Sequence, residues 1–152
     1  CNFDSFHADI FYDFPDTNYE DSQEVYVGLA LNNLAITPSV YVYYDFQEVD
    51  GFYAVADLNY GKDLSDNLSM EIGTSLGVGD SDYHAAWYGK HTAGVSDMTV
   101  YTGLSYALTD NLALNGGLAY TMYPDGAMAD SAEATYQYDE NISGGISLSF
   151  SY

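Results

Sequence analysis

The last eleven residues of the chain alternate between two kinds of side chain. From Ile142 to Tyr152, every second residue is Ile, Gly, Leu, Phe or Tyr, and every residue between them is Ser or Gly. A period of two places the two kinds on opposite faces of a β-strand, because successive side chains of a strand point in opposite directions. This segment is therefore predicted to be a strand with one apolar face, one face of very small polar residues, and an aromatic end at Phe150 and Tyr152.

The same alternation recurs along the chain, whereas no segment shows a convincing helical period of 3.6 residues. Each alternating segment has about ten residues, the length that a tilted strand needs to cross a lipid bilayer. Pro38 cannot donate a backbone hydrogen bond, so we expect it at a strand start or a bulge. The eight predicted strands cover residues 6–14, 25–31, 34–46, 52–60, 68–78, 98–108, 112–122 and 142–152.

The connections between these strands are of two kinds. Three are tight and nearly copies of one another: LNNL, LSDNL and LTDNL, at residues 31–34, 64–68 and 108–112. In an up-and-down meander, alternate connections lie on the same side, so the tight turns share one rim. The other rim then carries mostly longer, strongly acidic loops, and this asymmetry is typical of outer-membrane β-barrels. These longer connections cover residues 16–24, 47–51, 79–97 and 124–141.

The chain is strongly acidic, with 23 Asp and Glu residues against two lysines and no arginine, and a formal net charge of −21. This balance excludes a nucleic-acid partner, because phosphate binding depends on Lys and Arg. Acidic chains with few aromatic residues are typically disordered, but 16% of this chain is aromatic, including 17 tyrosines. The composition therefore favours an ordered fold. A solvated surface of the halophilic kind is the alternative explanation of the charge.

Cys1 is the only cysteine, so no internal disulfide can form. A cysteine at the first position of a mature bacterial lipoprotein carries lipid, which makes Cys1 a candidate for lipidation and the chain a candidate lipoprotein partner of a larger barrel. No apolar run approaches the roughly 18 residues of a membrane-spanning helix. A membrane role would therefore depend on strands.

The two faces of the predicted strands decide between a barrel and a soluble β-sandwich. A sandwich exposes Lys, Glu, Arg and Thr on its polar faces, whereas here those positions hold mostly Gly, Ser, Ala, Asn and Tyr. Small residues suit a curved inner wall, where a neighbouring tyrosine can lie over a glycine. Aromatic residues also gather near strand ends, as at the interfaces of a bilayer. These residues are Phe14, Phe46, Phe52, Tyr120 and Tyr152.

We therefore predict an all-β fold, an antiparallel up-and-down transmembrane β-barrel that forms one domain over residues 1–152. The alternative from another class is a secreted or surface structural protein whose Gly/Ser/Tyr sheets assemble with one another. The two differ in which face is covered. A barrel exposes its Leu, Ile and Val face to lipid, and an assembly buries it.

Several stretches of the chain resemble a family of bacterial outer-membrane proteins, the TorF-type porins, and more loosely the MltA-interacting outer-membrane barrels. The stretches are FYDFPDT, QEVYVGLAL, PSVYVYYDFQEVDGFYAVADLNYGKDL, SLGVGDSDYHAAWYGKHTAGVSD, YALTDNLALNGGLAYTMYPD and GGISLSFSY. The resemblance implies a bacterial outer-membrane location and a porin or small diffusion channel. Family members usually carry further N-terminal strands. The eight strands are therefore either a closed small barrel or the C-terminal part of a larger one, of roughly 12 strands.

Carboxylates and tyrosines on the polar face are the candidate lumen-lining residues. With no Lys or Arg facing inward, such a wall would favour cations over anions. The alternative is a filled interior in which the carboxylates are hydrogen-bonded to tyrosines. The candidates are Asp9, Asp13, Tyr41, Tyr43, Asp45, Tyr53, Asp57, Glu71 and Tyr101.

No combination of residues predicts an enzyme. The G-x-S-x-G spacing around Ser75 lies inside a predicted strand, whereas a nucleophile elbow needs a strand, a sharp turn and a helix. His7, His84 and His91 lack the close spacing of metal ligands. We expect His84 and His91 to be loop residues that pack against neighbouring aromatic side chains.

The acidic loops are the candidate sites for divalent cations. Asp80 and Asp82, in GDSDY, could supply oxygen ligands to Ca²⁺, although the rest of an EF-hand loop is missing and a solvated turn is the simpler explanation. We also expect Ca²⁺ or Mg²⁺ to bridge loop carboxylates to the phosphates of outer-membrane lipids. Other expected partners are small solutes or cations and, for an oligomer, further copies of the chain.

Overall fold

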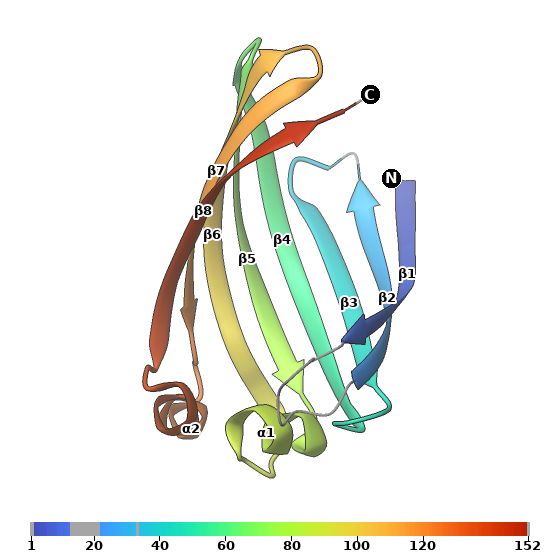
Figure 1. Cartoon of the computed structure of the whole chain (residues 1–152), viewed down its shortest axis with the longest axis vertical. Coiled ribbons are helices and arrows are strands. Elements are labelled where there is room, and N and C mark those ends of the chain that lie inside the picture. The colour runs from blue at the N-terminus through green and yellow to red at the C-terminus, as the bar shows by residue number, and fades with distance from the viewer. Residues whose placement is uncertain (1, 13–21, 33, 152) are drawn as a thin grey trace.

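The computed structural model describes residues 2–12, 22–32 and 34–151, and it contains one antiparallel sheet and two short helices (Figure 1). Each strand pairs with its neighbours in the sequence, in the order β1 to β8. The predicted all-β meander is therefore confirmed. The elements are β1 (Asn2–Tyr12), β2 (Ser22–Asn32), β3 (Thr37–Asp45), β4 (Gly51–Ser65), β5 (Leu68–Gly79), α1 (Ser81–Tyr88), β6 (Gly94–Thr109), β7 (Leu112–Met122), α2 (Gly126–Tyr136) and β8 (Glu140–Phe150).

The two rims of the sheet differ as predicted. The connections after β2, β4 and β6 are short, whereas the connections after β5 and β7 contain α1 and α2 at the opposite rim (Figure 1). The sequence analysis predicted no helix here, and that prediction was wrong. Both helices are too short for a clear period of 3.6 residues, with eight and eleven residues. Within the described part of the chain, neither helix has the length or apolarity that crossing a membrane requires.

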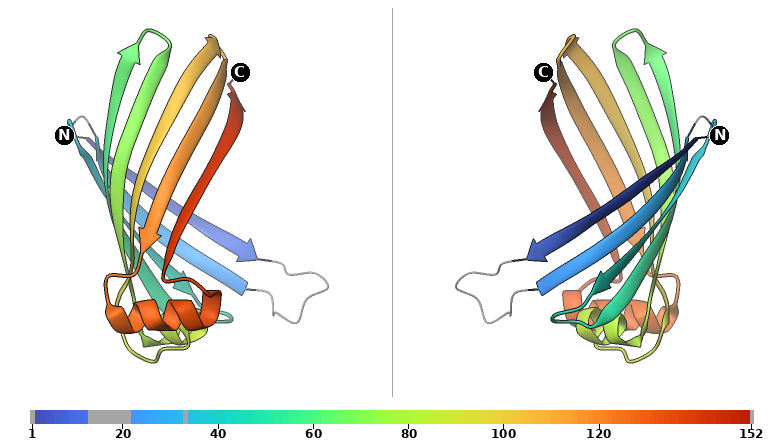
Figure 2. Two further views of the ribbon diagram at one scale, coloured as in Figure 1. Left: turned by 90° about the vertical axis from the view of Figure 1, so that its left-hand side faces the viewer. Right: turned by 90° about the vertical axis from the view of Figure 1, so that its right-hand side faces the viewer.

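The sheet is strongly curved but not closed (Figure 2). In the described residues β1 pairs with β2 alone and β8 with β7 alone, so a closed barrel is not found. Three register shifts, between Asp63 and Ser65, Leu76 and Val78, and Ala107 and Thr109, add local twist to the long central strands. Pro38 is the second residue of β3, as expected of a residue that suits a strand start.

The polar face of the sheet is concave, and its side chains meet across intervening strands. The Tyr53 hydroxyl on β4 donates to Asp97 Oδ1 on β6 over 3.1 Å, and the Tyr101 hydroxyl on β6 donates to Asp57 on β4 over 3.0 Å. Strand β5 lies between them and carries glycine beneath both contacts. Convergence over glycine is expected on the inner side of a curved sheet.

The apolar face is convex and uncovered. Leu58 is 50% exposed, Leu104 is 53% exposed and Ile146 is 83% exposed. Among the described residues, the buried apolar side chains are Ala30, Met128 and Ala132, and the last two belong to α2. A sandwich would bury the convex face against a second sheet, but one sheet is present. The sheet therefore has no core of its own on this face.

The two faces of strand β1 are the reverse of those predicted, with the side chains expected on the concave face lying on the convex one. Asp9 is paired with Val25 on the convex face, where it accepts a hydrogen bond from Gln23 Nε2 over 2.7 Å. Phe6 is paired with Gly28, and its ring centroid lies 6.0 Å from that of Tyr41 on the concave face. The prediction that Asp9 lines the concave wall was wrong, because pairing register, not the sequence of one strand, decides which face is inside.

Candidate functional site

Tyrosine side chains fill one half of the concave face by lying over glycines of the neighbouring strand. Tyr41 covers Gly28, Tyr101 covers Gly73, and Tyr53 covers Gly77, in each case leaving no room for a Cβ atom. These three tyrosines were predicted to line a lumen, and the structure places them on the concave face, together with Tyr43, whose ring lies 6.1 Å from that of Tyr53. The β2–β5 part of the wall is therefore packed with side chains.

Gly73→Ala should destabilise the fold, because its methyl group would displace the Tyr101 ring and break the hydrogen bond from Tyr101 to Asp57. We expect a loss of about 1–3 kcal/mol in the free energy of unfolding. Gly145→Ala is the matched control, since Gly145 belongs to the same face and has open space around it. Urea unfolding in detergent micelles measures both variants, and equal stabilities would contradict the packing described.

A polar network joins β4, β5 and β6 in the middle of the wall. Both carboxylate oxygens of Asp57 accept from the Tyr101 hydroxyl at 3.0 Å, and Asn59 Nδ2 lies 3.1 Å from the same hydroxyl oxygen. Asn59 Nδ2 also donates to Glu71 Oε2 over 3.4 Å. The predicted residues Asp57, Glu71 and Tyr101 therefore come together, with Asn59 as an addition. Asn59 belongs to the same alternating pattern of β4, and this pattern is the signal that could have identified it.

Asp45, another predicted wall residue, shares the concave face with Tyr43 through its pairing with Gly51 at the loop rim. Asp45 is 7% exposed and ends β3, where its Oδ1 accepts the backbone N–H groups of Gln47, Glu48 and Val49. Its other oxygen accepts the Ser22 hydroxyl over 2.5 Å, so Asp45 orders the β3–β4 turn. Asp13, Cys1 and Tyr152 lie outside the described residues. Phe150 ends β8 and is 65% exposed on the convex face.

Helix α1 packs against the concave face at the loop rim. It begins at Asp80, whose Oδ1 accepts the backbone N–H groups of Asp82 and Tyr83, and it ends at Gly89, which has a left-handed φ of 67°. The Tyr83 ring stacks on Tyr53 with centroids 4.9 Å apart, and this contact brings the helix onto the sheet. Ser75, the serine of the G-x-S-x-G spacing, lies inside β5, the strand that precedes α1, and not at a turn between strand and helix.

His84 is the central contact of α1. It is 1% exposed, with Nδ1 at 2.5 Å from the Thr92 carbonyl oxygen and Nε2 at 2.8 Å from Ser96 Oγ. The carbonyl can only accept, so Nδ1 donates to it, and Nε2 and the Ser96 hydroxyl share a second hydrogen bond. His84 packs against a neighbouring aromatic side chain as predicted, with its ring centroid 5.8 Å from that of Tyr88, but it belongs to a helix and not to a loop. His7 and His91 are exposed and lie elsewhere, so the histidines form no common site.

The two helices share an aromatic cluster at this rim. Tyr88 contacts Tyr123 and Tyr136 edge to face, each with centroids 5.8 Å apart, and the Tyr136 hydroxyl donates to the Trp87 carbonyl over 2.6 Å. Burial raises the pKa of Tyr88, so its hydroxyl stays protonated. The two helices that carry this cluster were not predicted, but their N-capping residues Asp80 and Asp125 are sequence signals that could have identified them.

The Ca²⁺ candidates Asp80 and Asp82 do not form a ligand cluster. Asp80 caps α1 with Oδ1, and its Oδ2 accepts the backbone N–H of Phe52 over 2.9 Å. Asp82 is exposed in the first turn of α1. Over residues 2–12, 22–32 and 34–151, no group of three or more His, Cys, Asp or Glu side chains is placed to hold a metal ion. Asp80 therefore has a structural role as the cap of α1, and Asp82 takes part in that cap through its backbone N–H.

The cap of α2 is sensitive to acid. Asp125 Oδ1 accepts the backbone N–H groups of Ala127 and Met128 and lies 3.3 Å from Lys90 Nζ, and these contacts, that of Met128 first, hold the pKa of this carboxyl below its usual range. Because the folded-state pKa of Asp125 is lowered, its negative charge stabilises the folded cap at pH values above the unfolded-state pKa of about 3.9. This stabilisation is lost as the pH falls through the folded-state pKa.

Hydrogen exchange of α2 should therefore accelerate as the pH falls below about 4, after correction for intrinsic exchange rates. Asp125→Asn keeps a capping oxygen but does not titrate, so the corresponding change in that variant should be absent. The same acid response in both proteins would assign the effect to another group.

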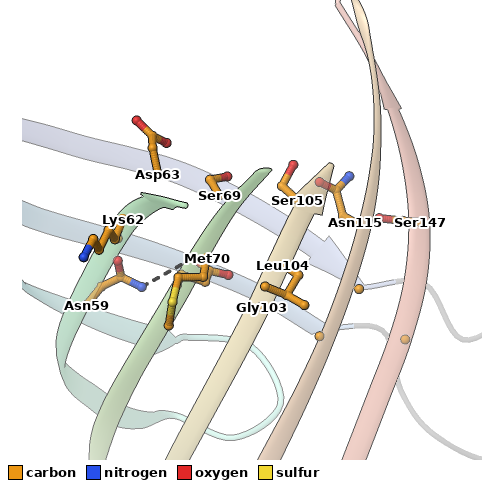
Figure 3. A pocket seen from close by; sticks show the side chains of 15 residues that line it. Asn59, Lys62, Asp63, Ser69, Met70, Gly103, Leu104, Ser105, Asn115 and Ser147 are labelled. Carbon is orange, nitrogen blue, oxygen red and sulfur yellow. Dashed lines mark hydrogen bonds between the residues drawn. The ribbon is translucent and has the colours of Figure 1, made fainter. Parts of the chain in front are cut away.

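An open cavity of about 590 Å³ lies on the concave face near the short-turn rim (Figure 3). It spans β4 to β8, and its wall is polar and rich in glycine. Among the predicted wall residues, Glu71 borders it. The residues that line it are Asn59, Gly61, Lys62, Asp63, Ser69, Met70, Glu71, Gly103, Leu104, Ser105, Asn115, Gly116, Gly117, Gly145 and Ser147.

No protein-family model matches the chain, and no curated protein matches it. Function therefore has to be inferred from the residues and their arrangement.

Proposed function

We propose that this chain forms the wall of a bacterial outer-membrane β-barrel that serves as a porin or small diffusion channel. The observation that carries this proposal is the uncovered convex face, on which Val, Leu and Ile side chains of the seven strands β2 to β8 remain exposed. Contiguous apolar surface of this extent has to be covered in a folded protein. Lipid covers it on the outside of a barrel, and the antiparallel meander is the topology of such proteins.

Aromatic residues on the convex face support a bilayer position. Tyr44 and Phe52 stack near the loop rim with centroids 4.4 Å apart, and Tyr60 and Tyr106 lie toward the other rim. Phe52 and Tyr60 belong to one strand, and their separation is about 26 Å at ~3.3 Å per residue. At a strand tilt of about 40° this is ~20 Å across the membrane, comparable to the ~25 Å apolar band of outer-membrane barrels.

The charges of the concave wall favour cations over anions. Asp57, Asp97 and Glu71 lie on this wall. Lys62 is paired with Met70, which places it on the convex face, and Lys90 lies in the loop after α1, beside Asp125. An acidic, tyrosine-lined lumen without a facing cation would therefore attract cations.

The free edges of β1 and β8 support the second candidate, a sheet assembly. Each edge offers unpaired backbone groups, which can template pairing with another chain. In a membrane the same edges need partners, because unpaired backbone groups are costly in lipid. The two edges would pair with each other in an eight-stranded barrel, or with further strands of a larger one.

Intact mass and detergent dependence of the natively isolated protein test the proposal. A protein that needs detergent and conducts in planar bilayers, with a reversal potential on the cation side under a KCl gradient, supports a cation-favouring porin. A mass above 16.7 kDa would indicate additional strands in the same polypeptide. A species of 16.7 kDa that is soluble without detergent, or that forms fibres, would overturn the proposal and favour the assembly.

Divalent cations at the acidic loops are proposed as a bridge to lipid phosphates. EDTA should lower the thermal stability of the protein in lipopolysaccharide-containing membranes and leave it unchanged in lipid-free detergent. Equal melting temperatures with and without EDTA in both settings would contradict a bridging role.

A further inference from the structure

The two halves of the concave face are filled to different degrees. Over β2 to β5, tyrosine rings cover the glycines and α1 packs against the loop end. Over β7 and β8, the inward positions hold only small side chains. Those on β7 are Ala113, Asn115, Gly117, Ala119 and Thr121, and those on β8 are Asn141, Ser143, Gly145, Ser147 and Ser149. Free space on the inner wall is therefore found along the β5–β8 side, where the cavity of about 590 Å³ lies.

The cavity is bordered by carboxylates without a cation on the same face. Lys62 also borders the cavity, but its pairing with Met70 assigns its side chain to the convex face, whereas Glu71 and Asp63 belong to the concave face. The other polar lining groups, among them Ser105 and Ser147, are uncharged. The wall is therefore complementary to a small cation or to water, and it repels anions.

Glu71 is held in a defined position beside this cavity. Its side chain lies over Gly103 of β6, where a Cβ atom would come within 2.8 Å of Glu71 Oε1. Its Oε2 accepts a hydrogen bond from Asn59 Nδ2 over 3.4 Å, which the dashed line in Figure 3 marks. Gly103 thus creates the room that lets the carboxylate reach across β6 toward the small-residue wall.

We propose that the solute path of the channel runs along the β5–β8 wall and that Glu71 selects small cations on it, hydrated monovalent ions or organic ammonium groups. This inference rests on the proposed channel function, but it concerns one side of the lumen and one carboxylate. The tyrosine side is structural, and the glycine- and serine-rich side is the conducting one.

Cysteine accessibility tests the path. In a Cys1→Ser background, Ser105→Cys and Ser147→Cys place thiols on the cavity wall, and Ile146→Cys places one on the convex face next to Ser147. Each variant, reconstituted in phospholipid vesicles, is treated with a trimethylammonium methanethiosulfonate or with its sulfonate analogue. We expect both wall cysteines to react, the cationic reagent faster than the anionic one, and Ile146→Cys to be protected by lipid.

Glu71→Gln in each wall-cysteine variant tests the selecting residue. One unit charge at about 7 Å in a water-filled path changes each reagent's local concentration roughly threefold, in opposite directions. The cation-to-anion rate ratio should therefore fall about five- to tenfold at Ser105→Cys, on the strand next to Glu71, and by less at Ser147→Cys, three strands away. Asp82→Gln, a loop carboxylate outside the cavity, is the matched control and should leave the ratio unchanged.

Each of three outcomes would overturn one specific claim. Unreactive cysteines at both wall positions would show that this side is filled, which overturns the path even in a conducting barrel. Wall cysteines whose rate ratio is unchanged by Glu71→Gln would overturn the role of Glu71. An Ile146→Cys variant that reacts as fast as Ser147→Cys would show that lipid does not cover the convex face, which overturns the proposed function instead.

Discussion

Leu104→Arg should destabilise the folded protein in a bilayer by about 1–3 kcal/mol, whereas Ser105→Arg should be nearly neutral. Leu104 is 53% exposed on the convex face of β6, two residues before Tyr106, and Ser105 is the next residue, bordering the concave cavity. A cation on the lipid-facing side of a barrel costs about 2–4 kcal/mol at the midplane and about 0–1 kcal/mol at the interfaces, so the cost at Leu104 lies between these values, whereas a cation facing water-filled space costs little. The pair therefore reports which face contacts lipid.

Urea unfolding of both variants in phospholipid vesicles measures the difference. Leu104→Ala provides the control for lost apolar area, since it removes the side chain without adding a charge. If the convex face were exposed to water, Leu104→Arg would be nearly neutral and would improve solubility. Stabilities of Leu104→Arg and Ser105→Arg within 0.5 kcal/mol of each other, on the order of ordinary surface variation, would exclude a lipid-facing convex side.

His84→Ala should release α1 from the inner wall and lower the local stability of this rim by about 3 kcal/mol. The change removes the hydrogen bond to the Thr92 carbonyl, leaves the buried Ser96 hydroxyl without its imidazole partner, and opens space beside Gly79. Ser96 is 0% exposed, so water cannot replace the imidazole without local opening. We expect the helix to separate from the sheet while the strands remain paired.

Native-state hydrogen exchange of residues 80–96 measures this release. A loss of about 3 kcal/mol corresponds to roughly 100-fold faster exchange, since 1.4 kcal/mol is a factor of ten. His91→Ala changes an exposed histidine of the same loop and should leave exchange unchanged. Equal exchange in the His84→Ala and His91→Ala variants would mean that the imidazole does not hold α1 in place.

The strands and their order were predictable from the sequence because they depend on local signals. Alternation from Leu112 to Met122 is visible in any short window, and β7 has these bounds. The three tight turns with Asn or Asp also act within a few residues, and they sorted the connections into two rims. Tyr41, Tyr53 and Tyr101 could be assigned to the inner wall because their strands alternate clearly.

Part of the candidate site was also predictable, and part was not. Asp57, Glu71 and Tyr101 share a face by period two, so their meeting needed only the correct register. The cavity was not predictable, because it depends on the space that remains in front of Gly117 and Gly145 once the sheet is curved. The docking of α1 depends on contacts of residues far apart in the sequence, such as Tyr53 with Tyr83.

By itself, the sequence determined the alternating faces, the short and long rims, and the absence of a facing cation on most of the polar wall. The tertiary structure decided three further points. It turned Asp9 of β1 to the convex face, placed His84 and Tyr83 against the sheet, and left β1 and β8 unpaired with each other. Alternation defines two faces of one strand, but only pairing with a neighbour, and the curvature of the whole sheet, decides which of them is inside.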